Sequence, residues 1–225
     1  LIAQKLGLPY ADDIYHLSYG MVELPTGKMQ SREGTVVDAD DLVAEMIDTS
    51  RRHTEELGKV KDFSAEELTS LYTTIGMGAM KFYLLRVDPK KKMIFNPEES
   101  IDFHGFTGPF IQYTHARIRS ILRKETPSAD IKDNTPLLKL EKEVCVILEQ
   151  YPQVVEDAAR ETDPSCIANY LFHLSKTFNS FYTAHSISGA ESEEKKQLRL
   201  RIAQMTSTVI KSGMQLLGIA VPERM

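Results

Sequence analysis

The buried-type positions of this chain recur mostly at spacings of three and four residues, which is the periodicity of amphipathic helices. The clearest case follows Thr107-Gly108-Pro109, a small polar residue, a glycine and a proline in the order that begins a helix. The stripe that this helix is expected to bury consists of Ile111, Thr114, Ile118, Ile121 and Leu122. The pattern predicts a helix that runs to about Lys124.

Cap residues predict where the other helices begin, because their side chains accept the first free backbone N–H groups. The starts predicted in this way are Asp38 or Asp40, the capping box Ser64-x-x-Glu67, the pair Asp163-Pro164 and the capping box Ser188-x-x-Glu191. Hydrophobic spacing predicts two further helices, one from about Leu137 to near Pro152 and a short one that starts at Val154. Gly218 is expected to end the last helix as a C-terminal cap.

Strands are predicted at two places only. Residues 14–19 form a run rich in β-branched and aromatic side chains that ends at Gly20, and Met93-Ile94-Phe95 forms a shorter one. The chain is therefore expected to be mainly α.

Composition narrows the class of protein. The 225 residues are 42% hydrophobic and 26% charged, which is typical of a globular protein with one large core or two smaller ones. No apolar run approaches the roughly 20 residues of a membrane span, and no signal peptide is apparent. Cys145 and Cys166 lack metal-ligand spacing, so we expect reduced cysteines, no metal site and a cytoplasmic protein. The net charge of −5 restricts any contact with nucleic acid to local patches.

A second stripe on the helix after Thr107 carries functional chemistry. Tyr113, Arg117, Ser120 and Lys124 lie four, three and four residues apart, so they share one face. Tyrosine can stack on an unpaired base, and arginine can stack or pair with a phosphate. The alternative is a solvated polar face with Tyr113 half buried, and the residues alone leave both open.

The segment ELPTGKMQSREGTVV also has two interpretations. Lys28 and Arg32 lie between Gly27 and Gly34, so a loop that bends easily would present two cations to a triphosphate. A surface hairpin with incidental charges fits the residues equally well.

Several motifs together favour the functional interpretation of both the Tyr113 and Arg117 face and the loop around Lys28 and Arg32. GKMQSREG resembles the KMSKS signature of class I aminoacyl-tRNA synthetases. With YHLSYGMV, IGMGAMKF, TGPFIQYTHARIRSIL, ANYLFHLSKTFNSFY and the terminal LLGIAVPERM, the whole chain resembles the C-terminal half of arginyl-tRNA synthetases.

The resemblance implies a fold and a division of the chain. A helix bundle that binds the anticodon is expected to follow the C-terminal remnant of a Rossmann-type catalytic domain. The implied division is 1–60 for the end of the catalytic domain with its KMSKS-like loop, 61–104 for a connecting region of helix and strand, and 105–225 for the anticodon-binding domain.

The resemblance also implies roles for individual residues. The catalytic positions of the signature loop correspond to Lys28, Ser31 and Arg32. The ATP-binding positions correspond to Tyr19, Gly20, Met21, Val22, Lys28 and Met29. The anticodon-loop positions correspond to Tyr113, Arg117, Tyr182 and Met225. The chain departs from the signature at its second lysine, which is Ser31 here with Arg32 beside it, so the cation that acts in its place stays open.

The implied activity is the attachment of arginine to its tRNA through an arginyl-adenylate, with ATP as substrate and magnesium bound to it. The HIGH signature, the arginine pocket and the domain that binds the tRNA core are absent from these residues, so the chain is expected to be a fragment that is inactive alone. One alternative is a non-catalytic helical module that binds RNA, with a vestigial loop. Another is a cysteinyl or methionyl synthetase, which the THAR helix and the ERM terminus disfavour.

Overall fold

The computed structural model describes residues 1–25, 38–56, 58, 62–128 and 135–225. Its helices are α1 (Ile2–Lys5), α2 (Ala39–Glu56), α3 (Ala65–Leu85), α4 (Pro97–Ser100), α5 (Gly108–Lys124), α6 (Lys139–Glu149), α7 (Tyr151–Glu161), α8 (Ser165–Ala184) and α9 (Glu193–Leu216), and its strands are β1 (Val22–Glu23) and β2 (Met93–Ile94). The prediction of a mainly α fold is confirmed. No helix in the described part of the chain is long and apolar enough to cross a membrane.

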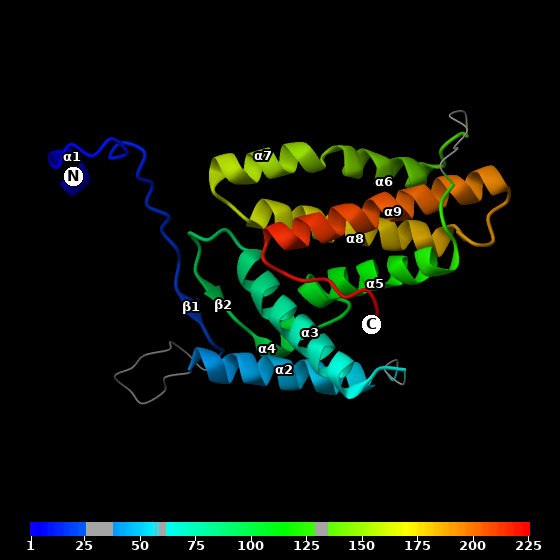
Figure 1. Cartoon of the computed structure of the whole chain (residues 1–225), viewed down its shortest axis with the longest axis horizontal. Helices are drawn as coiled ribbons and strands as arrows, with labels where there is room; N and C mark the ends of the chain where they lie inside the picture. Colours follow the sequence, from blue (N-terminus) through cyan, green and yellow to red (C-terminus); the bar gives the residue numbers. More distant parts are fainter. Residues whose placement is uncertain (26–37, 57, 59–61, 129–134) are drawn as a thin grey trace.

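A bundle of α5 to α9 forms the C-terminal half of the molecule (Figure 1). Helix α8 lies at its centre and packs against α5, α6, α7 and α9. The largest buried side chains of α8 are Leu171, Leu174, Phe178 and Phe181. Because these residues recur at three- and four-residue spacing, one face of α8 supplies much of the core.

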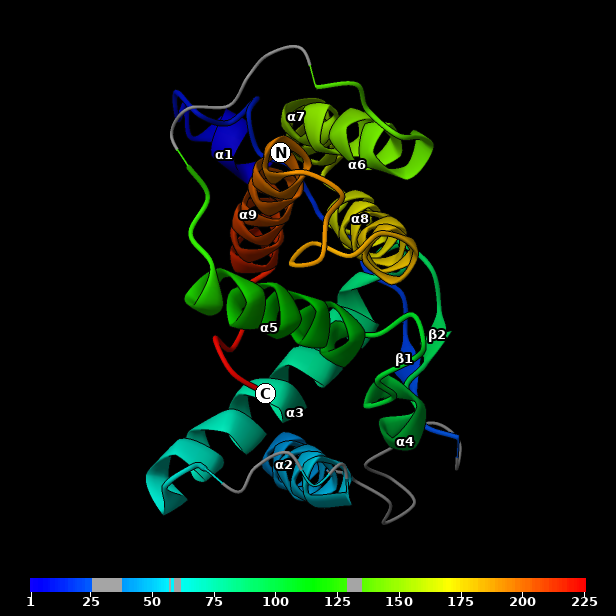
Figure 2. The ribbon, with the colours of Figure 1, turned by 90° about the vertical axis from the view of Figure 1, so that its right-hand side faces the viewer.

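Helices α2 and α3 form a second layer below the bundle, as Figure 2 shows from the side. Helix α3 also packs against α5, where the two backbones come very close. A Cβ atom on Gly108 would lie 2.5 Å from the carbonyl oxygen of Gly78, so Gly108 has no room for a side chain. This contact joins the layer of α2 and α3 to the bundle through backbone approach.

Most of the predicted helix starts are confirmed. Thr107 Oγ1 accepts a hydrogen bond from the backbone of Phe110, and Ser64 and Glu67 form the predicted capping box. The start of the last helix was predicted wrongly. Its N-cap is Ser192, whose side chain accepts from Lys195 N, and not Ser188.

The physical reason for the wrong start is the use of Glu191, which the predicted capping box required at its third helical position. The Glu191 carboxylate instead accepts a hydrogen bond from Arg199 at 2.9 Å. Glu191 thus binds α9 from a position outside the helix, and α9 begins two residues after Glu191, at Glu193.

The predicted strand over residues 14–19 is also wrong. This run is irregular and exposed, within an N-terminal arm that extends away from the body (Figure 1). The short strand β1 that follows pairs in parallel with β2, with Val22 opposite Met93. A strand needs a hydrogen-bonding neighbour as well as suitable side chains, and the described residues supply none for 14–19.

Candidate nucleic-acid interface

Two tyrosines and one arginine from different helices meet at the surface of the bundle. The guanidinium carbon of Arg117 lies 4.8 Å from the ring centroid of Tyr113 on α5 and 5.6 Å from that of Tyr182 on α8. All three side chains are half-buried. We call these three residues the tyrosine–arginine site. The cation lies within stacking distance of both rings, an arrangement worth about 0.5–2 kcal/mol for each pair.

Asn179 on α8 fixes the position of the arginine. Arg117 Nη1 donates to Asn179 Oδ1 at 2.6 Å, and Asn179 Nδ2 donates to Thr114 Oγ1 at 2.8 Å. The Thr114 hydroxyl donates in turn to the backbone oxygen of Phe110 at 2.9 Å, so it must accept from the asparagine. These linked hydrogen bonds fix which way the Asn179 amide faces, so its oxygen points to Arg117.

The electrostatics of the site favour an anionic or electron-rich ligand. Asn179 is neutral, and Arg117 forms no ion pair with any residue that the structure describes. The positive charge of Arg117 is therefore not neutralised by any described residue. It remains available to a phosphate or to the face of a base.

Each tyrosine ring is supported from behind by a phenylalanine. Tyr182 stacks with Phe178 at an interplanar angle of 12° and a centroid distance of 6.4 Å. Tyr113 meets Phe103 edge to face, with centroids 6.5 Å apart. Ring pairs of this kind restrict both side chains. The site is thus largely formed before any ligand binds.

The chain terminus lies on the same side as Tyr113. Met225 and Tyr113 both pack at the edge of one hydrophobic cluster, which includes Ile75, Ala79 and Phe103. Figure 1 shows the C-terminal tail running along α5 to reach this position.

Several hydrogen bonds and ion pairs from three helices hold the tail in place. They join Lys81 to the oxygen of Gly218, Gln112 to that of Ala220, His115 to that of Pro222, Arg119 and Lys211 to the Glu223 carboxylate, Arg123 to the Glu223 oxygen, and Arg224 to Glu67. Gly218 begins the tail with a φ of 67°, as expected of a C-terminal cap. Because the bonds follow one another almost residue by residue, Met225 has a defined place although it ends the chain.

The ATP-binding positions predicted from the resemblance are described in part. Gly20 N donates to Pro89 O at 2.6 Å, and Met93 N donates to Met21 O at 3.1 Å, so this backbone is joined to β2 and to the segment before it. A side chain on Gly20 would collide with the carbonyl group of Lys91. Tyr19 is 85% exposed, and Val22 forms part of β1. Of the remaining loop residues, Lys28, Met29, Ser31 and Arg32 lie outside the described residues.

The described ranges contain no group of three or more histidine, cysteine or carboxylate side chains that could hold a metal ion.

Sequence reasoning missed Asn179 altogether. Its spacing of three residues from Tyr182 would have placed the two on one face of a helix. Its contact with Arg117 depends on how α5 and α8 pack.

Comparisons with known proteins connect this geometry to a family. The DALR anticodon binding domain matches residues 111–225, and the catalytic domain described as tRNA synthetases class I (R) matches residues 1–96. The chain belongs to the arginyl-tRNA synthetase family.

Similarity to the arginyl-tRNA synthetase family runs along the whole chain. The arginine–tRNA ligase of Flavobacterium psychrophilum is 55% identical over 225 residues, which are 100% of this chain and 37% of that protein. The enzyme of the same name from Amoebophilus asiaticus is 50% identical and is covered to 39%. The chain therefore spans well under half the length of these curated relatives.

Two solved arginyl-tRNA synthetases share the fold. The structure from Thermus thermophilus has a TM-score of 0.88 at 30% identity and covers 99% of this chain, while 38% of that structure is matched. The structure from Plasmodium falciparum has a TM-score of 0.77 over 93% of this chain, with 35% of that structure matched. At 20% identity, the second comparison concerns the fold alone.

Proposed function

We propose that this chain is the part of an arginine–tRNA ligase that binds the anticodon loop of its tRNA. The observation that carries the proposal is the Arg117 guanidinium between the Tyr113 and Tyr182 rings, in a half-buried site on a domain of an anticodon-binding family. Unpaired bases of the loop stack on the two tyrosines, and Arg117 contacts a base face or a phosphate. Met225 packs beside a base near Tyr113.

The physical chemistry of stacking supports this assignment. Base–aromatic stacking contributes about 1–3 kcal/mol per base, and the phenol ring offers it to any base. Arg117 adds selectivity because its fork of donors is held in one direction by Asn179. The same cation on a mobile side chain would first have to be ordered by the RNA.

The N-terminal part contributes to ATP binding in this proposal. The backbone of residues 19–22 meets the adenine, with Tyr19, Gly20, Met21 and Val22 as its members. The cations Lys28 and Arg32, together with Ser31 and Met29, close on the phosphates, and charge on the leaving pyrophosphate is stabilised there. ATP brings magnesium with it, and we assign no described residue to that ion.

The remaining substrates and the division of the chain belong to the proposal too. Residues 1–60 end the catalytic domain, 61–104 connect, and 105–225 bind the anticodon. Arginine is bound by parts of the longer protein beyond these residues, and the reaction takes place in the cytoplasm. The chain alone is expected not to support exchange of pyrophosphate into ATP in the presence of arginine and tRNA.

The experiment is a titration of the anticodon stem–loop of an arginine tRNA with the wild-type chain and with Tyr113→Ala. We expect affinity to fall by roughly 5- to 150-fold, the equivalent of about 1–3 kcal/mol for one stacked base. Tyr10→Ala is the matched control, because this tyrosine is exposed on the N-terminal arm. Equal affinity of both variants and the wild type, with circular dichroism unchanged, would contradict the proposal.

A further inference from the structure

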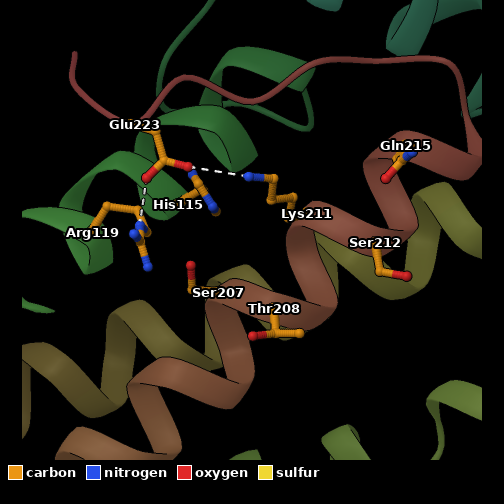
Figure 3. Close-up of a pocket in the computed structure, with 8 residues that line it drawn as sticks. All are labelled: His115, Arg119, Ser207, Thr208, Lys211, Ser212, Gln215 and Glu223. Carbon is orange, nitrogen blue, oxygen red and sulfur yellow. Dashed lines mark hydrogen bonds and ion pairs between the residues drawn. The ribbon is translucent and has the colours of Figure 1, made fainter. Parts of the chain in front are cut away.

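A polar pocket lies on the other side of α5 from the tyrosine–arginine site. It is a cavity of about 320 Å³ between α5, α9 and the C-terminal tail (Figure 3). Its lining residues are His115, Arg119, Ser207, Thr208, Lys211, Ser212, Gln215 and Glu223. Arg117 and Arg119 are two positions apart on one helix and so point about 200° apart, which separates the two sites. We call this cavity the His115 pocket.

The charged groups of the His115 pocket carry a net positive charge. Arg119 Nε and Lys211 Nζ both contact the Glu223 carboxylate, at 2.5 and 3.3 Å. One carboxylate between two cations leaves one positive charge in excess. Arg119 uses its Nε in this pair, and its two terminal amino groups have no partner among the residues that the structure describes, so they can bind a singly charged anion such as a phosphodiester.

His115 provides the second, independent observation. Its side chain is 0% exposed, and Nδ1 donates to the backbone oxygen of Pro222 at 3.0 Å. The other ring nitrogen, Nε2, has no hydrogen-bond partner among the residues that the structure describes. With the proton on Nδ1, Nε2 is an acceptor that lacks a donor. Figure 3 shows the ring between Arg119 and Lys211, facing α9.

A single ligand can pair with the excess positive charge and also donate to His115 Nε2 if it carries an anionic group and a hydroxyl group close together. Sulfate or a simple carboxylate would pair with the cations and leave His115 Nε2 unsatisfied. We propose that the His115 pocket binds a phosphoribose unit of RNA, with its phosphate on Arg119 and Lys211 and a ribose hydroxyl that donates to His115 Nε2. Thr208 Oγ1 donates to Gln204 O of its own helix at 3.0 Å, so it can accept from the sugar.

The hydroxyl contact gives this pocket a signature that stacking lacks. DNA of the same sequence keeps its phosphates and bases but has no 2′-hydroxyl, so it should lose the bond to His115 Nε2. The tyrosine–arginine site reads ring faces and is indifferent to the sugar. Failure of the two proposals is therefore distinguishable, because Tyr113→Ala weakens RNA and DNA alike while loss of the His115 contact weakens RNA only.

The experiment measures fluorescence anisotropy of a labelled single-stranded RNA and of its DNA counterpart against salt concentration. His115→Asn keeps a donor to the Pro222 oxygen through the amide nitrogen and removes the Nε2 acceptor. Lys211→Gln removes one phosphate contact. Lys142→Gln is its charge-matched control, because this exposed lysine lies on α6 and does not line the pocket.

We expect wild-type chain to prefer RNA over DNA, and His115→Asn to reduce this preference by roughly two- to tenfold, the effect of one hydrogen bond. Lys211→Gln should lower the salt slope of RNA binding by about 0.7, and Lys142→Gln should leave it unchanged. An unchanged RNA preference in His115→Asn, or equal slopes in the two lysine variants, overturns the proposal. If His115→Asn fails to fold, the lysine pair alone decides.

A free mononucleotide is the other source of the same chemistry, and AMP tests it as a competitor. AMP that displaces RNA from the wild-type chain but not from Lys211→Gln assigns the pocket to free nucleotide. Lack of displacement, together with the two variant effects above, assigns it to the RNA strand.

Discussion

Replacing Asn179 with alanine tests whether a pre-positioned arginine is what makes the tyrosine–arginine site bind RNA. The amide of Asn179 lies 2.6 Å from Arg117 Nη1 and 2.8 Å from Thr114 Oγ1, and alanine removes both contacts. Thr114 keeps the hydrogen bond that it donates to Phe110 O, so its hydroxyl stays satisfied within α5. The change thus frees Arg117 without removing any group that we propose to touch the RNA.

The size of the effect follows from these contacts. Ordering one long side chain on binding costs about 0.5–1.5 kcal/mol, and Asn179 has already ordered Arg117 in the free protein. Asn179→Ala should therefore weaken stem–loop binding by roughly 2- to 12-fold. Loss of a hydrogen bond to a charged group should lower the free energy of unfolding by about 1.5–3 kcal/mol.

The assay pairs a titration of the anticodon stem–loop with thermal unfolding of the same variant. Asn169→Ala is the control, because Asn169 is also on α8 but its amide, as far as the described residues show, donates to Ser165 O alone, at 2.7 Å. We expect the control to bind the stem–loop like the wild type. Wild-type affinity in Asn179→Ala, or an equal loss in Asn169→Ala, would refute the positioning role.

Three further predictions concern the fold that supports the site. Gly108→Ala puts a Cβ atom 2.5 Å from a backbone oxygen of α3 and should lower the free energy of unfolding by about 1–3 kcal/mol, measured by denaturant titration. Glu141→Gln removes the buried carboxylate that pairs with Arg199 at 2.8 Å and with Lys195 at 2.6 Å, and should lower the free energy of unfolding by about 3–5 kcal/mol; an unchanged denaturation midpoint would contradict the importance of these pairs. Burial lowers the pKa of His115 from its ordinary 6.5, so the docked tail should be most stable above that pH and loosen as pH falls through 6.5. For Glu223, burial raises the pKa but hydrogen bonds from Arg119 and Lys211 outweigh it and lower the pKa below 4.5, so loosening should continue below pH 4.5. The methyl resonance of the C-terminal methionine reports both steps, and a resonance that stays constant from pH 8 to well below pH 4.5 would contradict them.

Helix starts could be predicted from the sequence where the cap depends on residues close together in the chain. The caps at Thr107 and Ser64 involve residues three positions apart, so the chain carries the whole of each signal. Ser188 satisfied the same pattern but lost to Ser192, because Glu191 bonds to Arg199 on the following helix. The pattern reports a local preference, and a stronger tertiary contact displaced it.

The strand predicted at residues 14–19 failed for a related reason. Its side chains have high strand propensity, yet Ile14 and Tyr19 are exposed and the run lacks a paired neighbour among the described residues. Propensity describes how well side chains suit a pleated, half-buried surface. It cannot supply the surface itself.

In the candidate site too, contacts along one helix could be predicted from the sequence, and contacts between helices could not. The spacing of Tyr113 and Arg117 along one helix was sufficient to put them on one face. Their proximity to Tyr182 comes from the packing of α5 against α8, and the His115 bond to Pro222 joins residues 107 positions apart. Such contacts depend on the complete core, which is why Asn179 and the tail anchors were not predicted.

The central claim is that the rings of Tyr113 and Tyr182 hold unpaired nucleotides of an RNA loop. The most direct test is the fluorescence of an anticodon stem–loop that carries 2-aminopurine at a loop position, titrated with the wild-type chain and with Tyr113→Leu. We predict that the wild-type chain quenches the fluorescence on binding, because the base stacks on the phenol ring, and that the leucine variant does not. Equal quenching by both proteins, or none by the wild type at saturation, would contradict the account.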